Sequence, residues 1–325
     1  MQRRRRYAEL HCTTNFSFLQ GGSHPEELVS QAAALGYTSL AITDRASLSG
    51  VVRAHAAAKE SGIHLIIGAA IEPIDAAPLV LWVANKKGYK NLCRLLTTGL
   101  LKQGCSKEYD GQIDGSELRS RSPRCCLTAD EVAAHADGLL AGIPLTQLLD
   151  PVESGAALIR AWQDRLGKQL YGLAEVAMEG DDQERLLSYA RLSYETHIPL
   201  VAAGDVRYHS RDRQPLHDAL TAVRYGKTVE SIQGKLLSNG ERHLQDINHV
   251  AKRFSVLPGA VDRTLEIASR CSFSLDDISY EYPHAVVPSG WSPADYLSNL
   301  VWKGARKRYD NRVPEKVTDL LRHEL

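Results

Sequence analysis

Short apolar runs alternate with amphipathic segments along the first two thirds of the chain. Such runs predict strands at residues 7–12, 39–43, 64–67, 79–83, 138–141, 169–174 and 199–203. Helical periodicity lies between them, with start signals such as Ser23 before Pro25 and stop signals such as Gly36. About seven β/α units in some 210 residues favour a closed or nearly closed barrel with a parallel core over an open doubly wound sheet.

The pattern changes twice. Residues 102–126 are polar and rich in Arg and Ser, which predicts a mobile loop. After Tyr208 the strand signals stop, and helices are expected at 212–224, 246–254, 258–270, 293–309 and 314–325. The last pattern ends at Leu325 without a cap, so we expect a chain cut within a helix. The predicted domains are a barrel at 1–210, a helical extension and connector at 211–284, and a short helical segment at 285–325.

The composition argues against two classes of partner, nucleic acid bound through overall charge and membranes. The chain has 39 Lys and Arg residues and 39 Asp and Glu residues, so no overall positive charge draws it onto nucleic acid. No run reaches the roughly 18 apolar residues of a membrane span. We therefore expect no membrane partner. The six cysteines show no C-x-x-C pair and no disulfide spacing, which indicates reduced thiols in a cytoplasmic protein.

Polar side chains gather where the predicted strands end, which is where barrel enzymes carry their chemistry. The candidate site residues, in chain order, are His11, Thr13, Asp44, Arg45, Glu72, Glu175, Asp205 and Arg207. A divalent ion needs four to six His or carboxylate donors converging at such a place.

Several stretches, in order along nearly the whole chain, resemble the PHP (polymerase and histidinol phosphatase) domain at the head of bacterial C-family DNA polymerases. The segment around Leu10-His11-Cys12-Thr13 resembles the opening H-x-H motif, and Ile42-Thr43-Asp44-Arg45 resembles a motif that ends in Asp-His. Gly88-Tyr89-Lys90-Asn91-Leu92 resembles G-Y-x-N-L, and Asp205-Val206-Arg207 resembles D-x-H. The segments at 279–283 and 304–317 are similar to the entry into the polymerase palm, and the details lean to the error-prone branch.

This resemblance implies a distorted (β/α)7 barrel followed by the truncated beginning of the palm. It implies a parent protein active in damage-induced translesion synthesis. Its partners would be the rest of the polymerase chain, DNA held by other domains, and accessory translesion and sliding-clamp proteins. Mg²⁺ would serve the palm, whose carboxylates are expected beyond residue 325.

The chain departs from the family at the implied metal ligands. Thr13, Arg45 and Arg207 stand where the motifs have His, and Ala70 and Pro78 replace a Glu and another His. Arginine is always cationic and has no acceptor for a metal. We therefore expect a vestigial site without catalytic residues or a cofactor, in which His11, Asp44, Asp205 and a shifted His209 remain as weak metal candidates.

Two readings of the barrel stay open. The favoured one is a structural and interaction module, in which Arg45 or Arg207 pairs with a surviving carboxylate in place of the metal. The alternative is residual metal-dependent phosphoesterase or 3'–5' exonuclease activity. A histidine such as His11 is then either a ligand or a buried, hydrogen-bonded remnant, and Glu72 either reaches inward or faces solvent.

Overall fold

A computed structural model describes residues 5–102, 125–148, 152–278 and 286–325. The chain forms two compact units, Met1–Asp277 and Ile278–Leu325. The expected mobile loop at 102–126 lies almost wholly outside the described residues. None of the described helices is long and apolar enough to cross a membrane.

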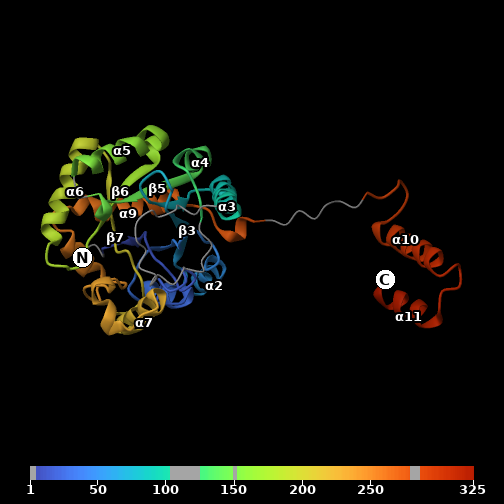
Figure 1. The fold of residues 1–325 in the computed structure, drawn as a ribbon. Coiled ribbons are helices and arrows are strands. Elements are labelled where there is room, and N and C mark those ends of the chain that lie inside the picture. Colours follow the sequence, from blue (N-terminus) through green and yellow to red (C-terminus); the bar gives the residue numbers. More distant parts are fainter. Residues whose placement is uncertain (1–4, 103–124, 149–151, 279–285) are drawn as a thin grey trace. The chain divides into compact units, whose positions relative to one another are not determined.

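Within the described ranges, seven strands form one sheet in their sequence order, and helices lie around the outside (Figure 1). The strands are β1 (Ala8–Glu9), β2 (Ser39–Ile42), β3 (His64–Ile71), β4 (Leu79–Val83), β5 (Leu139–Pro144), β6 (Leu170–Glu175) and β7 (Leu200–Ala203). The first unit carries helices α1 (Pro25–Ala34), α2 (Val51–Ser61), α3 (Lys86–Leu101), α4 (Ala129–Ala134), α5 (Val152–Leu166), α6 (Asp182–Thr196), α7 (Gln214–Tyr225), α8 (Ile247–Arg253) and α9 (Pro258–Arg270). The expected α/β barrel is thus confirmed.

The sheet closes at one end between the segments that follow β1 and β7. The N–H of Val206 donates to the carbonyl oxygen of His11 at 2.9 Å, and the N–H of Thr13 donates to the carbonyl oxygen of Val206 at 2.8 Å. At the other end, α9 packs against both β1 and β7. There Thr264 Oγ1 accepts a hydrogen bond from the N–H of Ala8, a residue of β1.

The prediction of a parallel core is wrong at β4, which runs antiparallel to both β3 and β5. Residues 72–78 are too few for a crossover between parallel strands, which needs a dozen residues or more. A hairpin forms instead, and β3 extends beyond the predicted residue 67 to Ile71 because Gly68–Ile71 pairs with Leu79–Trp82. The start of β4, with Pro78 just before it, therefore lies beside the end of β3.

The barrel is filled by apolar side chains from each of the strands β1 to β7. Trp82 is fully buried and donates from Nε1 to the carbonyl oxygen of Leu10 at 2.8 Å. Ile267, Ala268 and Cys271, at the end of α9, belong to the same core cluster. One helix from the region after residue 208 is thus part of the barrel wall.

The second unit is short and helical. It contains α10 (Pro293–Arg308) and α11 (Glu315–Glu324), close to the predicted ranges. Ser292 caps α10 by accepting from the N–H of Asp295 at 3.1 Å.

Candidate functional site: a carboxylate held by two arginines

Four of the predicted site residues, His11, Glu175, Asp205 and Arg207, meet at the end of the barrel where residues 11–13 pair with Val206. His11 follows β1, Glu175 ends β6, and Asp205 follows β7. His11 Nδ1 lies 2.6 Å from Glu175 Oε1 and 3.8 Å from Asp205 Oδ1. A carboxylate accepts hydrogen bonds, so Nδ1 of His11 carries the proton. The parallel strands β1, β6 and β7 end together, which explains this convergence.

Asp205 is held by two guanidinium groups. Arg207 Nη2 lies 2.7 Å from Asp205 Oδ1, and Arg242 Nη1 lies 2.6 Å from Asp205 Oδ2. The side chains of Asp205 and Arg242 are only 12% and 13% exposed. The expected pairing of Arg207 with a surviving carboxylate is therefore present. Asp205 also has a φ of 43°, a left-handed conformation that few non-glycine residues adopt.

Arg242 was not anticipated from the sequence, because it lies in a loop far along the chain. Residues 207–208 run beside residues 242–243, with a bridge between Tyr208 and His243. This pairing carries the Arg242 side chain to Asp205. Arg242 Nη2 also lies 3.4 Å from Glu179 Oε1, a contact that ties the loop after β6 into the cluster. No local pattern around Arg242 indicates these contacts.

The remaining predicted residues lie elsewhere. Asp44 is buried and bound by neutral donors: the N–H and Oγ1 of Thr14, both at 2.8 Å, and Oγ of Ser17 at 2.7 Å. Arg45 pairs with Glu72 at 2.6 Å on the surface, where their side chains are 39% and 60% exposed. Glu72 therefore faces solvent, as one of the two readings expected.

Two further candidates have partners of their own. Thr13 is buried and closes the barrel through its backbone N–H. His209 Nδ1 lies 2.8 Å from Ser23 Oγ and 4.0 Å from Glu27 Oε2, so its ring nitrogen is engaged by these residues.

The charges of the cluster depend on one another. Burial works to raise the pKa of Asp205, but Arg207 and Arg242 lower it to about 2. Burial works to lower the pKa of His11, but Glu175 and Asp205 raise it above its usual value. Burial raises the pKa of Asp44 despite its hydrogen bonds from Ser17 and Thr14.

The donors present do not fit a divalent cation. Both oxygens of Asp205 face guanidinium groups, and Glu175 engages Nδ1 of His11. Within the described ranges, no set of three or more His, Cys, Asp or Glu side chains is grouped so that it could hold a metal ion. A cation at Asp205 would meet two fixed positive charges.

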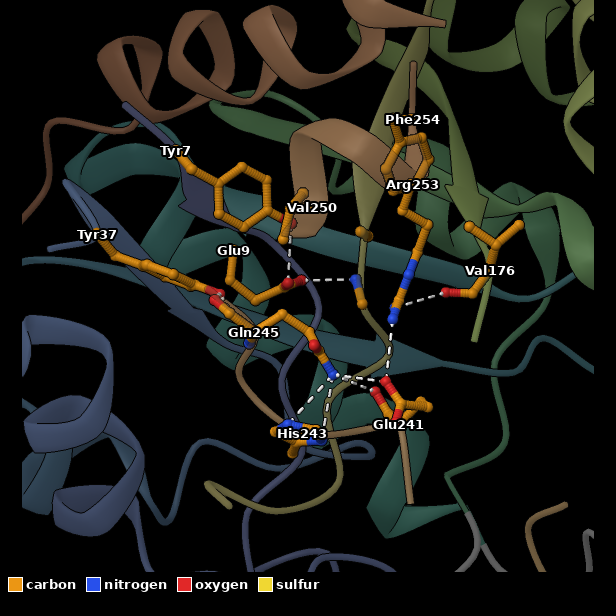
Figure 2. A pocket seen from close by; sticks show the side chains of 12 residues that line it. Tyr7, Glu9, Tyr37, Val176, Glu241, His243, Gln245, Val250, Arg253 and Phe254 are labelled. Carbon is orange, nitrogen blue, oxygen red and sulfur yellow. Dashed lines mark hydrogen bonds and ion pairs between the residues drawn. The ribbon is translucent and has the colours of Figure 1, made fainter. Parts of the chain in front are cut away.

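A small pocket, lined by apolar and charged side chains, lies near the seam between β1 and β7 (Figure 2). Its volume of about 10 Å³ has room for about one water molecule and none for a substrate. Glu9 lies there fully buried, accepting from the hydroxyl of Tyr7 at 2.9 Å and from the N–H of Gly204 at 3.0 Å. Across the pocket, Arg253 lies 3.1 Å from Glu241. The pocket therefore joins β1 to the segment after β7.

Comparison with known proteins identifies the fold family. The model of the PHP domain matches residues 9–174, which is half of the chain. The chain belongs to the PHP domain family. The match includes His11, Asp44 and Arg45 of the predicted site, whereas Glu175 follows it directly and Asp205 lies 31 residues after its end.

The chain is also similar to error-prone DNA polymerases. It is 42% identical to the enzyme of that name from Rhodopirellula baltica and 38% identical to that from Dechloromonas aromatica, in each case over 98% of this chain. It spans only 27% and 29% of the lengths of these relatives. Among solved structures, an amidohydrolase from Chromobacterium violaceum matches with a TM-score of 0.45 at 17% identity, covering 63% of this chain and 89% of that one. A likeness this low supports no conclusion about chemistry.

Proposed function

We propose that the chain is the PHP-domain part of an error-prone DNA polymerase that acts in damage-induced translesion synthesis. We further propose that its barrel is a structural and interaction module without chemistry of its own. The observation that carries this proposal is the ion pairing of Asp205 with both Arg207 and Arg242. The relatives named error-prone DNA polymerase support the wider role.

Arg207 and Arg242 supply the positive charge beside Asp205 that a metal ion would otherwise supply. Guanidinium groups keep their charge at every working pH and offer donors that match a carboxylate. At a few ångströms from a divalent cation, each would repel it by several kcal/mol in a partly buried site. The cluster thus neutralises Asp205 without a metal ion.

Each residue of the cluster then has a structural task. Arg242 draws the segment after Gly240 onto the end of β7. His11 and Glu175 join the ends of β1 and β6. With these contacts in place, the end of the barrel that carries the Asp205 cluster forms a stable surface that other parts of the polymerase can contact.

The polymerase chemistry belongs elsewhere in this proposal. Nucleotidyl transfer needs clustered carboxylates that hold two Mg²⁺ ions, and we assign these to a palm outside the 325 residues. Residues 285–325 would begin that palm. The proposed partners are the rest of the polymerase, DNA held by other domains, and sliding-clamp and accessory translesion proteins in the bacterial cytoplasm.

Elemental analysis of the purified chain tests the barrel's role. We expect no stoichiometric Zn²⁺, Mn²⁺ or Mg²⁺, and no nuclease activity on single-stranded DNA. Two tightly held metals per chain would refute the proposal. A phosphodiesterase rate that chelators abolish and that His11→Ala removes would instead establish the residual exonuclease.

A further inference from the structure

An open groove of about 600 Å³ runs along one face of α10 in the second unit. It is lined by Gly290, Trp291, Asp295, Ser298, Asn299, Trp302 and Arg306. The α10 residues among these recur three or four positions apart, so they share one side of the helix. From Asp295 to Arg306 that side is about 16 Å long.

Two tryptophans provide the flat apolar surface of the groove. Trp291 is 47% exposed, although large aromatic side chains are usually well buried. Its ring lies 6.0 Å from the ring of Tyr296 at an interplanar angle of 69°, so a second ring supports it. Exposed aromatic rings beside polar groups suit the stacking of nucleobases, because every base has a π face.

One cation, Arg306, lines the groove, and four more lie within six residues of it in the sequence. Lys303, Arg306, Lys307, Arg308 and Arg312 are exposed, and Asp310 is the single acidic residue between Lys303 and Arg312. Among the described residues, none of these five cations forms an ion pair. This local excess contrasts with the even balance of the whole chain, and unpaired Lys and Arg are the groups that bind phosphates.

The other end of the groove is polar. Asp295 accepts from the hydroxyl of Ser292 at 2.6 Å, as part of the cap of α10. Its negative charge lies about 16 Å from Arg306, measured along the helix. Between them, Ser298 and Asn299 offer hydrogen-bond donors and acceptors. The groove thus combines a cationic end, aromatic surface and polar groups along its length.

We propose that this groove binds single-stranded DNA, with bases stacked on Trp291 and Trp302 and phosphates on Arg306 and its cationic neighbours. The ligand class rests on the proposed function, that of a DNA polymerase. The combination of stacking surface and unpaired cations favours a flexible single strand over a duplex, whose bases are already stacked. Binding by stacking is tolerant of base sequence.

Tryptophan fluorescence reports on this groove selectively. The chain has four tryptophans, and Trp82 and Trp162 are buried at 0% and 1% exposure. Titration of the full 325-residue chain with an oligothymidylate of about 12 nucleotides should therefore quench only Trp291 and Trp302. Labelled oligonucleotide anisotropy should show that Trp302→Ala weakens binding by about 5- to 100-fold.

Arg306→Gln should lower affinity and reduce the slope of log affinity against log salt by about 1. Lys316→Gln on α11 is the matched control, since it removes one exposed cation of the same unit that does not line the groove. Equal effects of Arg306→Gln and Lys316→Gln would overturn a specific phosphate contact. Quenching by iodide but not by DNA would overturn the proposal, because it shows exposed rings alone.

If the groove binds a second copy of the chain and not DNA, light scattering will show a dimer. A dimer of the chain that Trp302→Ala makes monomeric would overturn the DNA assignment. Metal analysis tests the other proposal, that the barrel is a structural module without a metal, independently of DNA binding. Failure of DNA binding in a metal-free protein would therefore sink this inference and leave the role of the barrel intact.

Discussion

The backbone N–H of Arg207 donates to the carbonyl oxygen of Arg242 at 2.9 Å. The two arginines that hold Asp205 are thus joined through their backbones as well as through the carboxylate. This arrangement positions both guanidinium groups from a single short stretch of parallel pairing. It makes the cluster a cooperative unit, in which loss of one arginine leaves the other facing Asp205 alone.

Arg242→Ala should destabilise the first unit strongly. Its side chain and that of Asp205 are both mostly buried, and breaking such a pair costs about 3–5 kcal/mol. Arg45→Ala is the control, because the exposed pair of Arg45 with Glu72 contributes about 0–1 kcal/mol. Thermal and urea unfolding would measure the difference. Equal losses of unfolding free energy in the two variants would mean that the Asp205 cluster contributes no more to stability than an exposed ion pair.

Stability should fall in acid through Asp205. Its folded pKa of about 2 lies below the ordinary aspartate value of 3.8, so the stabilisation is present above about pH 4 and is lost as the pH falls towards 2. The pKa of Asp44 is raised, so its contribution to the unfolding free energy grows as the pH falls, opposite to that of Asp205. A comparison of two proteins that both keep Asp44 removes this contribution. The difference in unfolding free energy between the wild type and Asp205→Asn, measured from pH 2 to 7, isolates the effect. A difference that does not change with pH contradicts it.

His11 should titrate above its usual pKa. Glu175 and Asp205 face its ring and favour the charged form, whereas burial and Arg207 oppose it. The stabilisation from charged His11 is complete below pH 6.5 and is lost as the pH rises through the folded pKa. NMR titration of the His11 ring would show the raised value, and Glu175→Gln should lower it. A value that Glu175→Gln leaves unchanged would exclude this carboxylate as the cause.

Gly88→Ala should destabilise the barrel by at least about 1–3 kcal/mol. A Cβ at Gly88 would lie 1.8 Å from the carbonyl oxygen of Gly138, so α3 and the start of β5 would have to separate. Gly259→Ala, near the start of α9, meets no atom within 4 Å and should be neutral or stabilising by up to about 1 kcal/mol. Chemical denaturation of both variants checks the contrast. If Gly259→Ala destabilises the protein equally, the loss in Gly88→Ala cannot be assigned to the close contact of Gly88 with Gly138.

The sequence predicted the elements better than their contacts. The strand at 79–83 was predicted at its observed bounds, because Pro78 before it and Asn85 after it mark its ends. Its direction was missed, since periodicity does not report whether a strand pairs in a parallel or antiparallel sense. The hairpin that reverses β4 also places Glu72, just after β3, where Arg45 pairs with it and faces away from the site.

The site was predicted in part for the same reason. His11, Glu175 and Asp205 could be brought together from strand ends alone, because parallel strands end at one edge. Arg242 could not, because its place depends on the pairing of residues 207–208 with 242–243. Long-range pairing of this kind leaves no mark in local composition.

The position of α9 has a consequence for protein production and for domain exchange. A fragment ended near residue 210 would contain all seven strands but would expose the core that Ile267 and Cys271 cover. It would also leave the N–H of Ala8 without Thr264. Such a fragment should aggregate or bind hydrophobic dyes, and the shortest expressible barrel should extend past Cys271. Transplanting this barrel into another protein would likewise require α9 to be included with it.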